Sequence, residues 1–331
     1  MQSLVSVIIV NHNGRRYIEQ CIRGIIESSY QNIELIVVDN GSTDGSDKAI
    51  KRLYQCYREV IPIKCFFLKR NYGPNVARNL GIRNARGELC LFVDHDAILT
   101  KDAITKMVSF IVKRHDIAAL QAKLILLKEP GKIDTCGAYL TLFGFVIEPC
   151  SGKPTSTCEK PLPVLGGRGT FMVKKSVLRK VGLFDESFFL GWDETEFFWR
   201  IWLAGYKVLS FPQAVAYHAR SSATKLNYEG FKNGCKTFIK LLEIKNLIPV
   251  FCIHTLAWVY LILKELRRDK GAIGKFVNQL KQLVEDLPDI FAKRRFVQKY
   301  IRKVSDKTYF PFIIATMPIN EQIKRANRLI S

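Results

Sequence analysis

Short apolar runs alternate with amphipathic segments along the first third of the chain. The runs are rich in β-branched residues and almost free of charge, which is typical of strands buried on both faces of a parallel sheet. The segments between them have the three-to-four-residue apolar spacing of helices. This alternation predicts an α/β sheet with right-handed crossovers. The predicted strands are 4–10, 33–38, 63–68 and 88–93, and the predicted helices are 15–29, a segment ending near Tyr57, and 74–85.

The alternation loosens after about residue 115. Residues 117–127 are expected to form another strand, and residues 128–163, with many Gly, Pro, Thr and Lys, are expected to form loops or a short hairpin. Regular structure resumes with a strand over Thr170–Val173 and a helix over Lys175–Val181. We therefore place a first domain at residues 1–224.

The last part of the chain, residues 225–331, is apolar and basic without strand alternation, and it is predicted to be helical. Its apolar run from Asn246 to Leu263 is flanked by Lys and Arg and is close to the about 20 residues that a membrane-spanning helix needs. Pro249 and His254 weaken that interpretation. Basic apolar helices also lie in the headgroup plane of an anionic bilayer. We expect membrane association, with a helical bundle packed on the first domain as the alternative.

Composition narrows the classes of protein. Apolar residues make up 48% of the 331 residues, which is enough for a full core, and the net charge of +21 favours a polyanionic partner such as an anionic membrane or a phosphorylated substrate. Nucleic acid has only this charge in its favour, so we predict no nucleic-acid partner. The nine cysteines form no C-x-x-C pair, which argues against a zinc cluster. The first residues lack a secretion signal, which predicts an intracellular location.

Polar residues follow the predicted strands where each strand ends. Asn11 follows the first strand, Asp39 the second, and Asp94 and Asp96 the fourth. Because these ends meet at one edge of a parallel sheet, the side chains are expected to share one crevice. A dinucleotide-binding dehydrogenase would need a G-x-G-x-x-G turn after the first strand, and "VNHNGRRY" does not contain it.

The spacing of Asp94 and Asp96 points to a cation. Two neighbouring carboxylates repel each other unless a cation lies beside them. Mg²⁺ uses one or two protein carboxylates together with substrate phosphates, so the pair can hold a metal that in turn binds a diphosphate. Two capping acids at a strand end would leave the same pattern.

Five stretches of the sequence carry a family resemblance. They are "VSVIIVNHNG", "IELIVVDNGSTDGS", "NYGPNVARNLGIRNARGELCLFVDHDA", "GTFMVKKSVLRKVGLFDESFFLGWDETEFFWRIWLAGYKV" and "AVAYHARSS". In this order, across residues 4–222, they resemble family-2 glycosyltransferases of the GT-A fold, and within that family the rhamnosyltransferase-like branch. The resemblance implies a Rossmann-like mixed sheet, with the basic helical region as a C-terminal extension.

The resemblance also implies roles for single residues. Asp39 matches the acid that bonds the nucleobase of a sugar nucleotide, with the backbone at Asn11 helping to hold the base. Arg78 matches a basic residue close to the donor's nucleotide or phosphates. Asp94 matches a residue near the ribose or sugar, and Asp96 matches the metal ligand. His218, later in the chain, matches a histidine near the metal and diphosphate. The loop from Gly167 to Thr170, whose glycines allow close approach of the backbone, is expected to line the donor sugar.

The catalytic base is expected in "GWDETEFFWR". In the family an acidic pair begins a helix, and its second acid deprotonates the acceptor hydroxyl. Glu194 falls on that position and Asp193 on the one before it, in the reverse of the family's usual Glu-then-Asp order. The acids would also suit the positive end of a helix dipole without any catalytic role. Glu196 would face elsewhere on a helix.

These implications define an expected function. The protein is predicted to be an inverting, hexosyltransferase-type enzyme of polysaccharide biosynthesis that depends on Mg²⁺ or Mn²⁺. Its donor would be a UDP-, GDP- or dTDP-linked sugar, and its acceptor a hydroxyl of a glycan or lipid-linked glycan at the cytoplasmic face of the cell membrane, where the protein would be peripheral or monotopic. The alternatives are a polyprenyl- or dolichyl-phosphate sugar synthase and a catalytically inactive nucleotide-sugar-binding scaffold.

Overall fold

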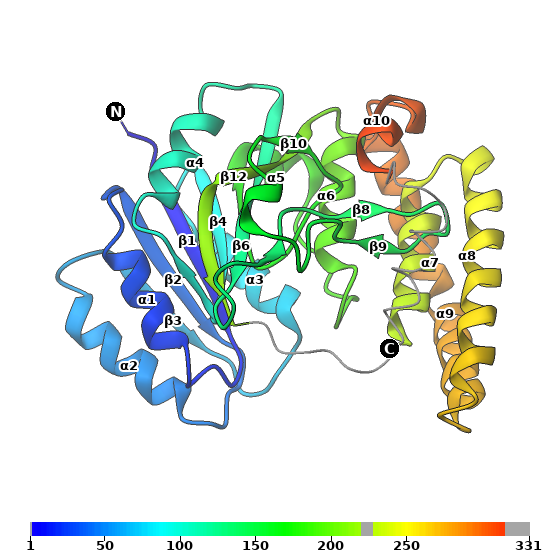
Figure 1. Ribbon diagram of the computed structural model, residues 1–331, viewed down its shortest axis with the longest axis horizontal. Coiled ribbons are helices and arrows are strands. Elements are labelled where there is room, and N and C mark those ends of the chain that lie inside the picture. Colours follow the sequence, from blue (N-terminus) through cyan, green and yellow to red (C-terminus); the bar gives the residue numbers. More distant parts are fainter. Residues whose placement is uncertain (1, 220–227, 315–331) are drawn as a thin grey trace.

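A computed structural model describes residues 2–219 and 228–314, and Figure 1 shows their arrangement. A twisted mixed sheet with helices on both faces forms one side of the molecule, and a group of helices from the C-terminal part forms the other. The strands of the large sheet are β1 (Val5–Asn11), β2 (Ile33–Asp39), β3 (Ile63–Phe67), β4 (Leu89–Asp94), β5 (Ala97–Leu99), β6 (Ile117–Leu126), β7 (Ile133–Thr135), β10 (Leu162–Pro163), β11 (Thr170–Lys174) and β12 (Lys207–His218). The helices packed on it are α1 (Ile18–Ile26), α2 (Ser46–Tyr57), α3 (Pro74–Asn84), α4 (Ala103–Ile111), α5 (Lys175–Val181) and α6 (Asp193–Leu203).

The sheet has the strand order β10-β12-β6-β11-β4-β1-β2-β3, with β5 paired to β12 and β7 to β6. β3, β2, β1 and β4 run parallel, as expected for strands joined by crossover helices. β11 lies antiparallel between β4 and β6, which makes the sheet mixed. The predicted α/β fold of the GT-A type is thereby confirmed.

The two faces of the sheet carry separate apolar cores because successive side chains of a strand point to opposite faces. On β1, Val5, Val7 and Ile9 pack with the buried face of α1. Ile8, between them, packs on the opposite face with Ala77 of α3. This burial on both faces explains why the strands are apolar at nearly every position instead of at every second one.

Most of the predicted elements are present, with ends within a few residues. The sequence interpretation did not name β5, α4 or β12. β12 is the strand that carries His218 into the sheet, and its register against β6 shifts between Phe211 and Val215. That irregularity interrupts the alternation by which a strand is recognised in a sequence. The region of residues 128–163 contains the predicted hairpin as β8 (Tyr139–Leu140) and β9 (Val146–Ile147), with a 3-10 turn η1 (Thr155–Thr157).

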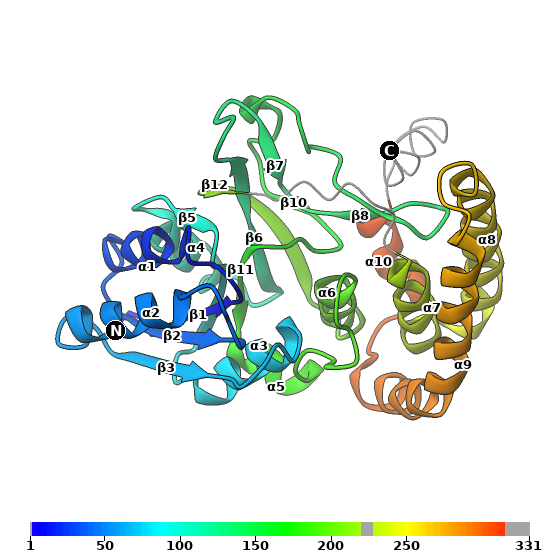
Figure 2. The ribbon, with the colours of Figure 1, turned by 90° about the horizontal axis from the view of Figure 1, so that it is seen from below.

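The C-terminal helices are α7 (Glu229–Leu241), α8 (Ile244–Glu265), α9 (Ala272–Phe296), the π-helical turn η2 (Val297–Ile301) and α10 (Asp306–Ile313). α7 lies between α6 and the pair formed by α8 and α9 (Figure 2). Phe238 and Leu241 of α7 enter the same apolar cluster as Trp199 of α6. The helices therefore share a core with the sheet domain. The proposed domain boundary at residues 224 and 225 lies outside the described residues, as do residues 315–331 of the C-terminal region.

α8 has the length and apolar composition of a membrane-spanning helix. Its most apolar stretch is for the greater part not buried in the protein. It is the one helix of this kind among the residues that the structure describes.

Candidate active site

Three neighbouring strands bring the predicted donor-binding residues to one edge of the sheet. In the register of the parallel strands, Asn11 at the end of β1 pairs with Asp39 at the end of β2. Val10 pairs with Asp94 at the end of β4. This register confirms the sequence prediction that these residues meet, because the carboxyl ends of aligned parallel strands lie at the same edge of the sheet.

Asp39 and Asn11 form a buried hydrogen-bonded pair. Asn11 Nδ2 donates to Asp39 Oδ1 over 2.7 Å, and also lies within hydrogen-bond distance of Ser42 Oγ and Ser46 Oγ. The backbone N–H of Ser42 donates to Asp39 Oδ2 over 3.1 Å. These donors hold the Asp39 carboxylate in a fixed orientation at the base of the loop that follows β2. Such a carboxylate can accept a hydrogen bond from a ring N–H, as uracil, thymine and guanine offer.

Gly41, in the same loop, is required for two reasons. Its φ of 72° lies in the left-handed region that favours glycine. A Cβ at this position would also lie 2.4 Å from Arg70 Cα. The "DNGS" stretch thus lets the loop that follows β2 approach the loop that follows β3 closely, next to the pair formed by Asn11 and Asp39.

Asp94, Asp96 and His218 form a compact group of ligand atoms. The pairing of β12 with β5 places His218 opposite Ala97, directly after Asp96. One oxygen or nitrogen of each of the three side chains lies within 4.8 Å of the other two. Two carboxylates and one imidazole suit Mg²⁺ or Mn²⁺, with open positions for phosphate oxygens. The donor set therefore fits the divalent cation that the sequence predicted.

His218 is oriented from behind by a second acid, Asp134. Nδ1 of the imidazole lies 2.7 Å from Asp134 Oδ2, while Nε2 lies 3.2 Å from Asp96 Oδ1. Burial alone would lower the pKa of His218, but the hydrogen bonds to Asp134 and Asp96 and the charge of Asp94 raise it to about 9. In the absence of a cation the imidazolium thus balances these acids. With a cation bound, Nε2 is the nitrogen free to coordinate it.

Arg168 connects this acid to the loop predicted to line the donor sugar. Its guanidinium lies 3.0 Å from Asp134 and 2.9 Å from Glu148. The loop itself joins the metal group directly, because the backbone N–H of Asp94 donates to the carbonyl of Gly169 over 2.8 Å. Gly167 packs against Gln121, whose Oε1 would lie 2.1 Å from a Cβ there. Thr170, in contrast, is fully buried.

The acids of α6 converge on Arg78 of α3. Arg78 Nη1 lies 2.5 Å from Asp193 Oδ2, and Nη2 lies 2.5 Å from Glu194 Oε1. The same Nη2 lies 4.0 Å from Asp94 Oδ1. Arg78 thus lies between the predicted base and the two aspartates Asp94 and Asp96 (the D-x-D pair). It does not project alone toward the donor. Its predicted contact with the nucleotide or phosphates stays a prediction.

The two acids of α6 differ in their surroundings. The side chain of Asp193 is 5% exposed and that of Glu194 is 16% exposed. Glu194 contacts Nη2 of Arg78, the same nitrogen that lies near Asp94. Glu194 is therefore nearer than Asp193 to the D-x-D pair. Burial raises the pKa of Glu194 to about 8; Arg78 opposes this rise, and Asp193 and Asp94 add to it. A general base is most effective when its pKa lies near the working pH, and burial moves the pKa of Glu194 in that direction.

The residue before the acid pair has a strained backbone. Trp192 has a φ of 68°, a conformation uncommon for residues other than glycine, and it is the N-cap residue directly before α6. Its indole packs edge-on against Phe238 of α7. The other aromatic residues of the motif, Phe197, Phe198 and Trp199, are fully buried. They therefore belong to the core and do not form a sugar-binding wall.

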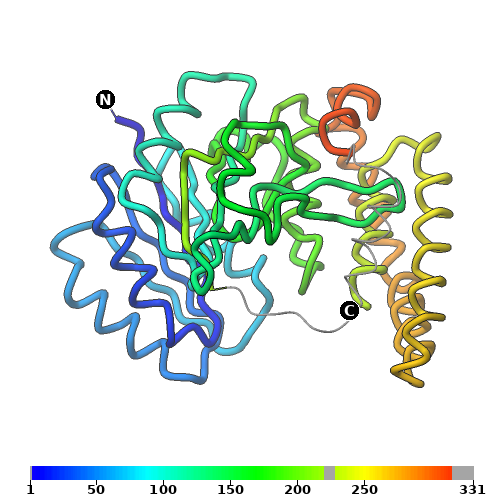
Figure 3. The backbone as a smooth tube through the Cα atoms, in the orientation of Figure 1, coloured from blue at the N-terminus to red at the C-terminus, as the bar shows by residue number. Residues whose placement is uncertain are grey.

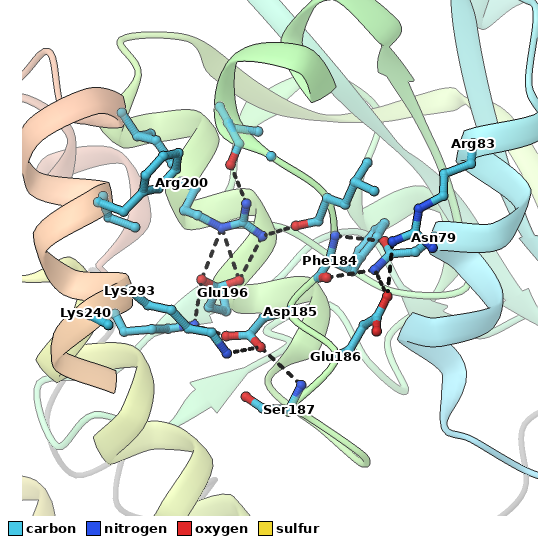
Figure 4. Close-up of a pocket in the computed structure, with 17 residues that line it drawn as sticks. Asn79, Arg83, Phe184, Asp185, Glu186, Ser187, Glu196, Arg200, Lys240 and Lys293 are labelled. Carbon is cyan, nitrogen blue, oxygen red and sulfur yellow. Dashed lines mark hydrogen bonds and ion pairs between the residues drawn. The ribbon is translucent and has the colours of Figure 1, made fainter. Parts of the chain in front are cut away.

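A cavity of about 570 Å³ lies between α3, α6 and the C-terminal helices α7 and α9, and buried ion pairs line it (Figure 4). Lys240 of α7 lies 2.6 Å from Asp185 and 2.9 Å from Glu196. Lys293 of α9 lies 2.8 Å from Asp185. Burial opposes ionisation of Asp185, but Lys240 and Lys293 hold its pKa well below the usual range. Glu196 also pairs with Arg200 at 3.0 Å, so it faces away from Glu194, as predicted.

Sequence reasoning did not identify Asp134, Arg168, Asp185 or Lys240. Arg168 had a usable signal, because it is a lone cation between glycines in "GGRGT" beside a predicted site. Asp134 lies in a region predicted only as loops, and no local pattern distinguishes it from a solvated acid. Lys240 looks like a surface residue of a basic helix, yet it is 1% exposed.

Comparison with known proteins shows what the first part of the chain is similar to. The mixed sheet is of the GT-A type. Residues 6–134 match the sequence profile of glycosyl transferase family 2. An uncharacterized glycosyltransferase of Haemophilus influenzae is 35% identical over 150 residues, which are 42% of this chain and 56% of the relative. The Bacillus subtilis glycosyltransferase TuaG, assigned by name to teichuronic acid biosynthesis, is 36% identical over 111 residues, which are 34% of this chain and 43% of TuaG. The matches thus span about half the length of these relatives.

Solved structures share the fold at low sequence identity. S. aureus TarS, residues 1–349, has a TM-score of 0.58 and 18% identity, and the likeness covers 89% of this chain and 86% of that one. The mannosyltransferase PcManGT of Pyrobaculum calidifontis, solved with GDP-Man and Mn²⁺, has a TM-score of 0.53 and 16% identity, covering 99% and 81%. GalNAc-T7, solved with UDP, GalNAc and Mn²⁺, has a TM-score of 0.63 and 16% identity, covering 92% and 59%.

Proposed function

We propose that the protein transfers a sugar from a nucleotide-diphosphate sugar to a hydroxyl group, with inversion at the anomeric carbon and with Mg²⁺ or Mn²⁺ bound. The observation that carries the proposal is Arg78. Its guanidinium joins the acid pair Asp193 and Glu194 to Asp94 on the donor side of the crevice, so the base and the donor-binding residues occupy one site.

Each side of the crevice has a separate task. Asp39, held by Asn11, accepts from the nucleobase. A cation held by Asp96 and His218 would neutralise the diphosphate leaving group. Glu194 takes the proton of the acceptor hydroxyl, which then attacks the anomeric carbon in line. A single displacement of this kind inverts the anomeric configuration.

The acceptor is proposed to be a hydroxyl of a glycan or lipid-linked glycan. A phosphate acceptor is already ionised at neutral pH and needs no base, whereas a hydroxyl does need one. The Glu194 carboxyl, with its pKa raised by burial, supplies that base. The name of TuaG supports a role in making a cell-surface polymer. The rhamnosyltransferase-like branch, and the placement at the cytoplasmic face of the membrane, are part of this proposal.

The donor is proposed to be a UDP-, GDP- or dTDP-sugar. TarS has been solved with UDP-GlcNAc and PcManGT with GDP-Man, so proteins of this fold bind either base. The hydrogen bond expected at Asp39 does not distinguish these bases, because each has a ring N–H.

The test is release of nucleotide diphosphate by the purified full chain. Each of the three donor classes is incubated with Mn²⁺ or Mg²⁺, with and without a mixture of glycan acceptors. We expect turnover with one class, and its loss on chelation and in Asp96→Ala. Turnover that is unchanged in Asp96→Ala with EDTA present would contradict the metal site. Donor binding without turnover, unaffected by Glu194→Gln, would favour an inactive scaffold.

A further inference from the structure

The outer face of α8 carries a continuous row of exposed apolar side chains. Most of these residues are four positions apart, so the row winds by about 40° per step across the exposed half of the helix. Leu256 alone is 70% exposed. The row consists of Ile244, Ile248, Cys252, Leu256, Tyr260 and Leu263. In Figure 3, α8 forms the outer edge of the molecule, on the side away from the sheet.

The neighbouring helix α9 also exposes apolar side chains. It lies beside α8, and it exposes Ile273, Val277 and Val284 to between 51% and 64%. Soluble monomers rarely expose apolar side chains so densely, and a patch of this kind marks an interaction site.

Basic residues surround the connection between the two helices. Lys264, Arg267, Arg268 and Lys270 are exposed there, and only Glu265 and Asp269 among the residues from 264 to 270 are acidic. An apolar row flanked by Lys and Arg complements an anionic lipid surface. Each Lys or Arg near such a surface contributes about 1 kcal/mol to the free energy of membrane binding.

The packing of α8 decides how it meets a bilayer. Its inner side holds His254, Trp258 and Leu261 at 0–4% exposure. His254 Nδ1 lies 3.1 Å from the carbonyl of Phe143, in the turn between β8 and β9. This side of α8 is therefore attached to the protein along the length of the helix.

A spanning α8 would carry its neighbour α9 into the hydrocarbon. α9 exposes Lys275, Lys281, Glu285 and Asp289 along its length. Each charge at the bilayer centre would cost at least about 2.5 kcal/mol. An orientation in the plane of the membrane avoids this cost, because an interfacial helix enters only about 5–10 Å below the headgroups.

We infer that the α8–α9 face is a monotopic membrane-binding surface, with α8 lying in the headgroup plane of an anionic bilayer. The inference deepens the proposed function, on which it rests for its biological setting, because it places the active site beside the membrane. The His254 and Trp192 rings lie 6.4 Å apart, and Trp192 directly precedes Asp193. The buried side of α8 thus reaches the residue that begins the base-bearing helix. A lipid-linked glycan held at the bilayer surface would be presented to that helix.

Vesicle binding by the full chain tests the inference without donor or acceptor. We expect co-sedimentation with vesicles of phosphatidylglycerol and phosphatidylcholine, and at least tenfold weaker binding to phosphatidylcholine alone. Ile248→Glu combined with Leu256→Glu should weaken binding at least tenfold. The matched control is Val60→Glu, an exposed apolar residue at 65% exposure in the sheet domain, which should bind like the unchanged chain.

Two exposed natural cysteines report the orientation. An environment-sensitive fluorophore on Cys252 of the apolar row should move to shorter wavelength when vesicles are added, in a chain with Cys56→Ser and Cys65→Ala. The same fluorophore on Cys56 of α2, with Cys252→Ser and Cys65→Ala, should not change. Quenchers at graded depths in the bilayer should place the Cys252 label near the headgroups.

Several results would overturn the inference. They are no vesicle binding, equal responses at Cys56 and Cys252, quenching of the Cys252 label at the bilayer centre, and a stable dimer in solution that Leu256→Glu dissociates. The last result would assign the face to a second copy of the chain. Nucleotide release, measured separately on soluble donor, keeps a failure of this inference distinct from a failure of the proposed transferase activity.

Discussion

Asp134 Oδ2 lies 2.7 Å from His218 Nδ1, although 84 residues separate the two in the sequence. The hydrogen bond leaves Nε2 facing Asp96 and sets the imidazole ring in one orientation. A carboxylate behind a metal-binding histidine normally tunes both its orientation and its basicity, so Asp134 is expected to position the ligand without touching the metal.

Asp134→Asn should therefore weaken metal binding by about 10- to 100-fold. The measurement is the Mn²⁺ concentration that gives half-maximal nucleotide release. Because saturating Mn²⁺ should restore most of the activity, this effect is separable from a folding defect. Asp116→Asn, which removes a surface ion pair with Lys207, is the control and should leave the Mn²⁺ requirement unchanged. An unchanged requirement in Asp134→Asn would contradict the positioning role.

Asp96→Ala should reduce turnover at least on the order of 100-fold, since it removes a carboxylate ligand of the cation. In contrast with Asp134→Asn, added Mn²⁺ should recover little of the loss. Chelation of the unchanged protein with EDTA should give a similar loss that added Mn²⁺ reverses. Turnover that survives both treatments would show that the D-x-D pair holds no essential cation.

Glu194→Gln should lower kcat by about 10²- to 10⁴-fold, with a smaller change in donor binding, because it removes the proton acceptor. Asp193→Asn should lower kcat less, since Asp193 is more buried and lies on the far side of Arg78 from Asp94. Steady-state kinetics on both variants measures the difference. If Asp193→Asn proves the more damaging, Asp193 is the base.

The rate should rise with pH through the range of the Glu194 pKa. Burial, chiefly, raises that pKa to about 8, and a base acts in its deprotonated form, so kcat/KM should increase between pH 6 and 9.

The stability of the protein should follow the opposite trend with pH. A carboxyl whose folded pKa is raised loses its contribution as pH rises toward that value. Glu194→Gln should therefore raise Tm by a few degrees at pH 9, relative to the unchanged protein, and much less at pH 5. Equal Tm differences at both pH values would exclude a raised pKa.

Lys240→Met should destabilise the protein by about 3–5 kcal/mol, because it leaves the buried carboxylates of Asp185 and Glu196 without their shared cation. Lys293→Met makes a matched control. Its side chain is 36% exposed and contacts the same Asp185, so its loss should cost about 1 kcal/mol or less. Chemical denaturation of both variants measures the two values. Similar values for the two would show that burial of Lys240 adds nothing.

The elements of the sheet domain could be predicted because their signals are local. An uninterrupted β-branched run identifies β1 or β2 without reference to any partner strand. Parallel pairing then brings Asn11, Asp39 and Asp94 together, since strand ends of equal register meet at one edge. β12 was not recognised, because the register shift between Phe211 and Val215 disrupts the alternation of its side chains.

The sequence by itself determined the α/β class, the family resemblance and the residue types at the strand ends. Those properties follow from local periodicity and from motifs of a few residues. Only the tertiary structure decided that Arg78 pairs with Glu194 across 116 residues, that Asp134 supports His218, and that Lys240 is buried. It also decided which side of α8 is covered by protein and which side is exposed. The physical reason is that an ion pair or a buried face depends on which distant segments pack together, and a side chain's chemical type does not specify its partner.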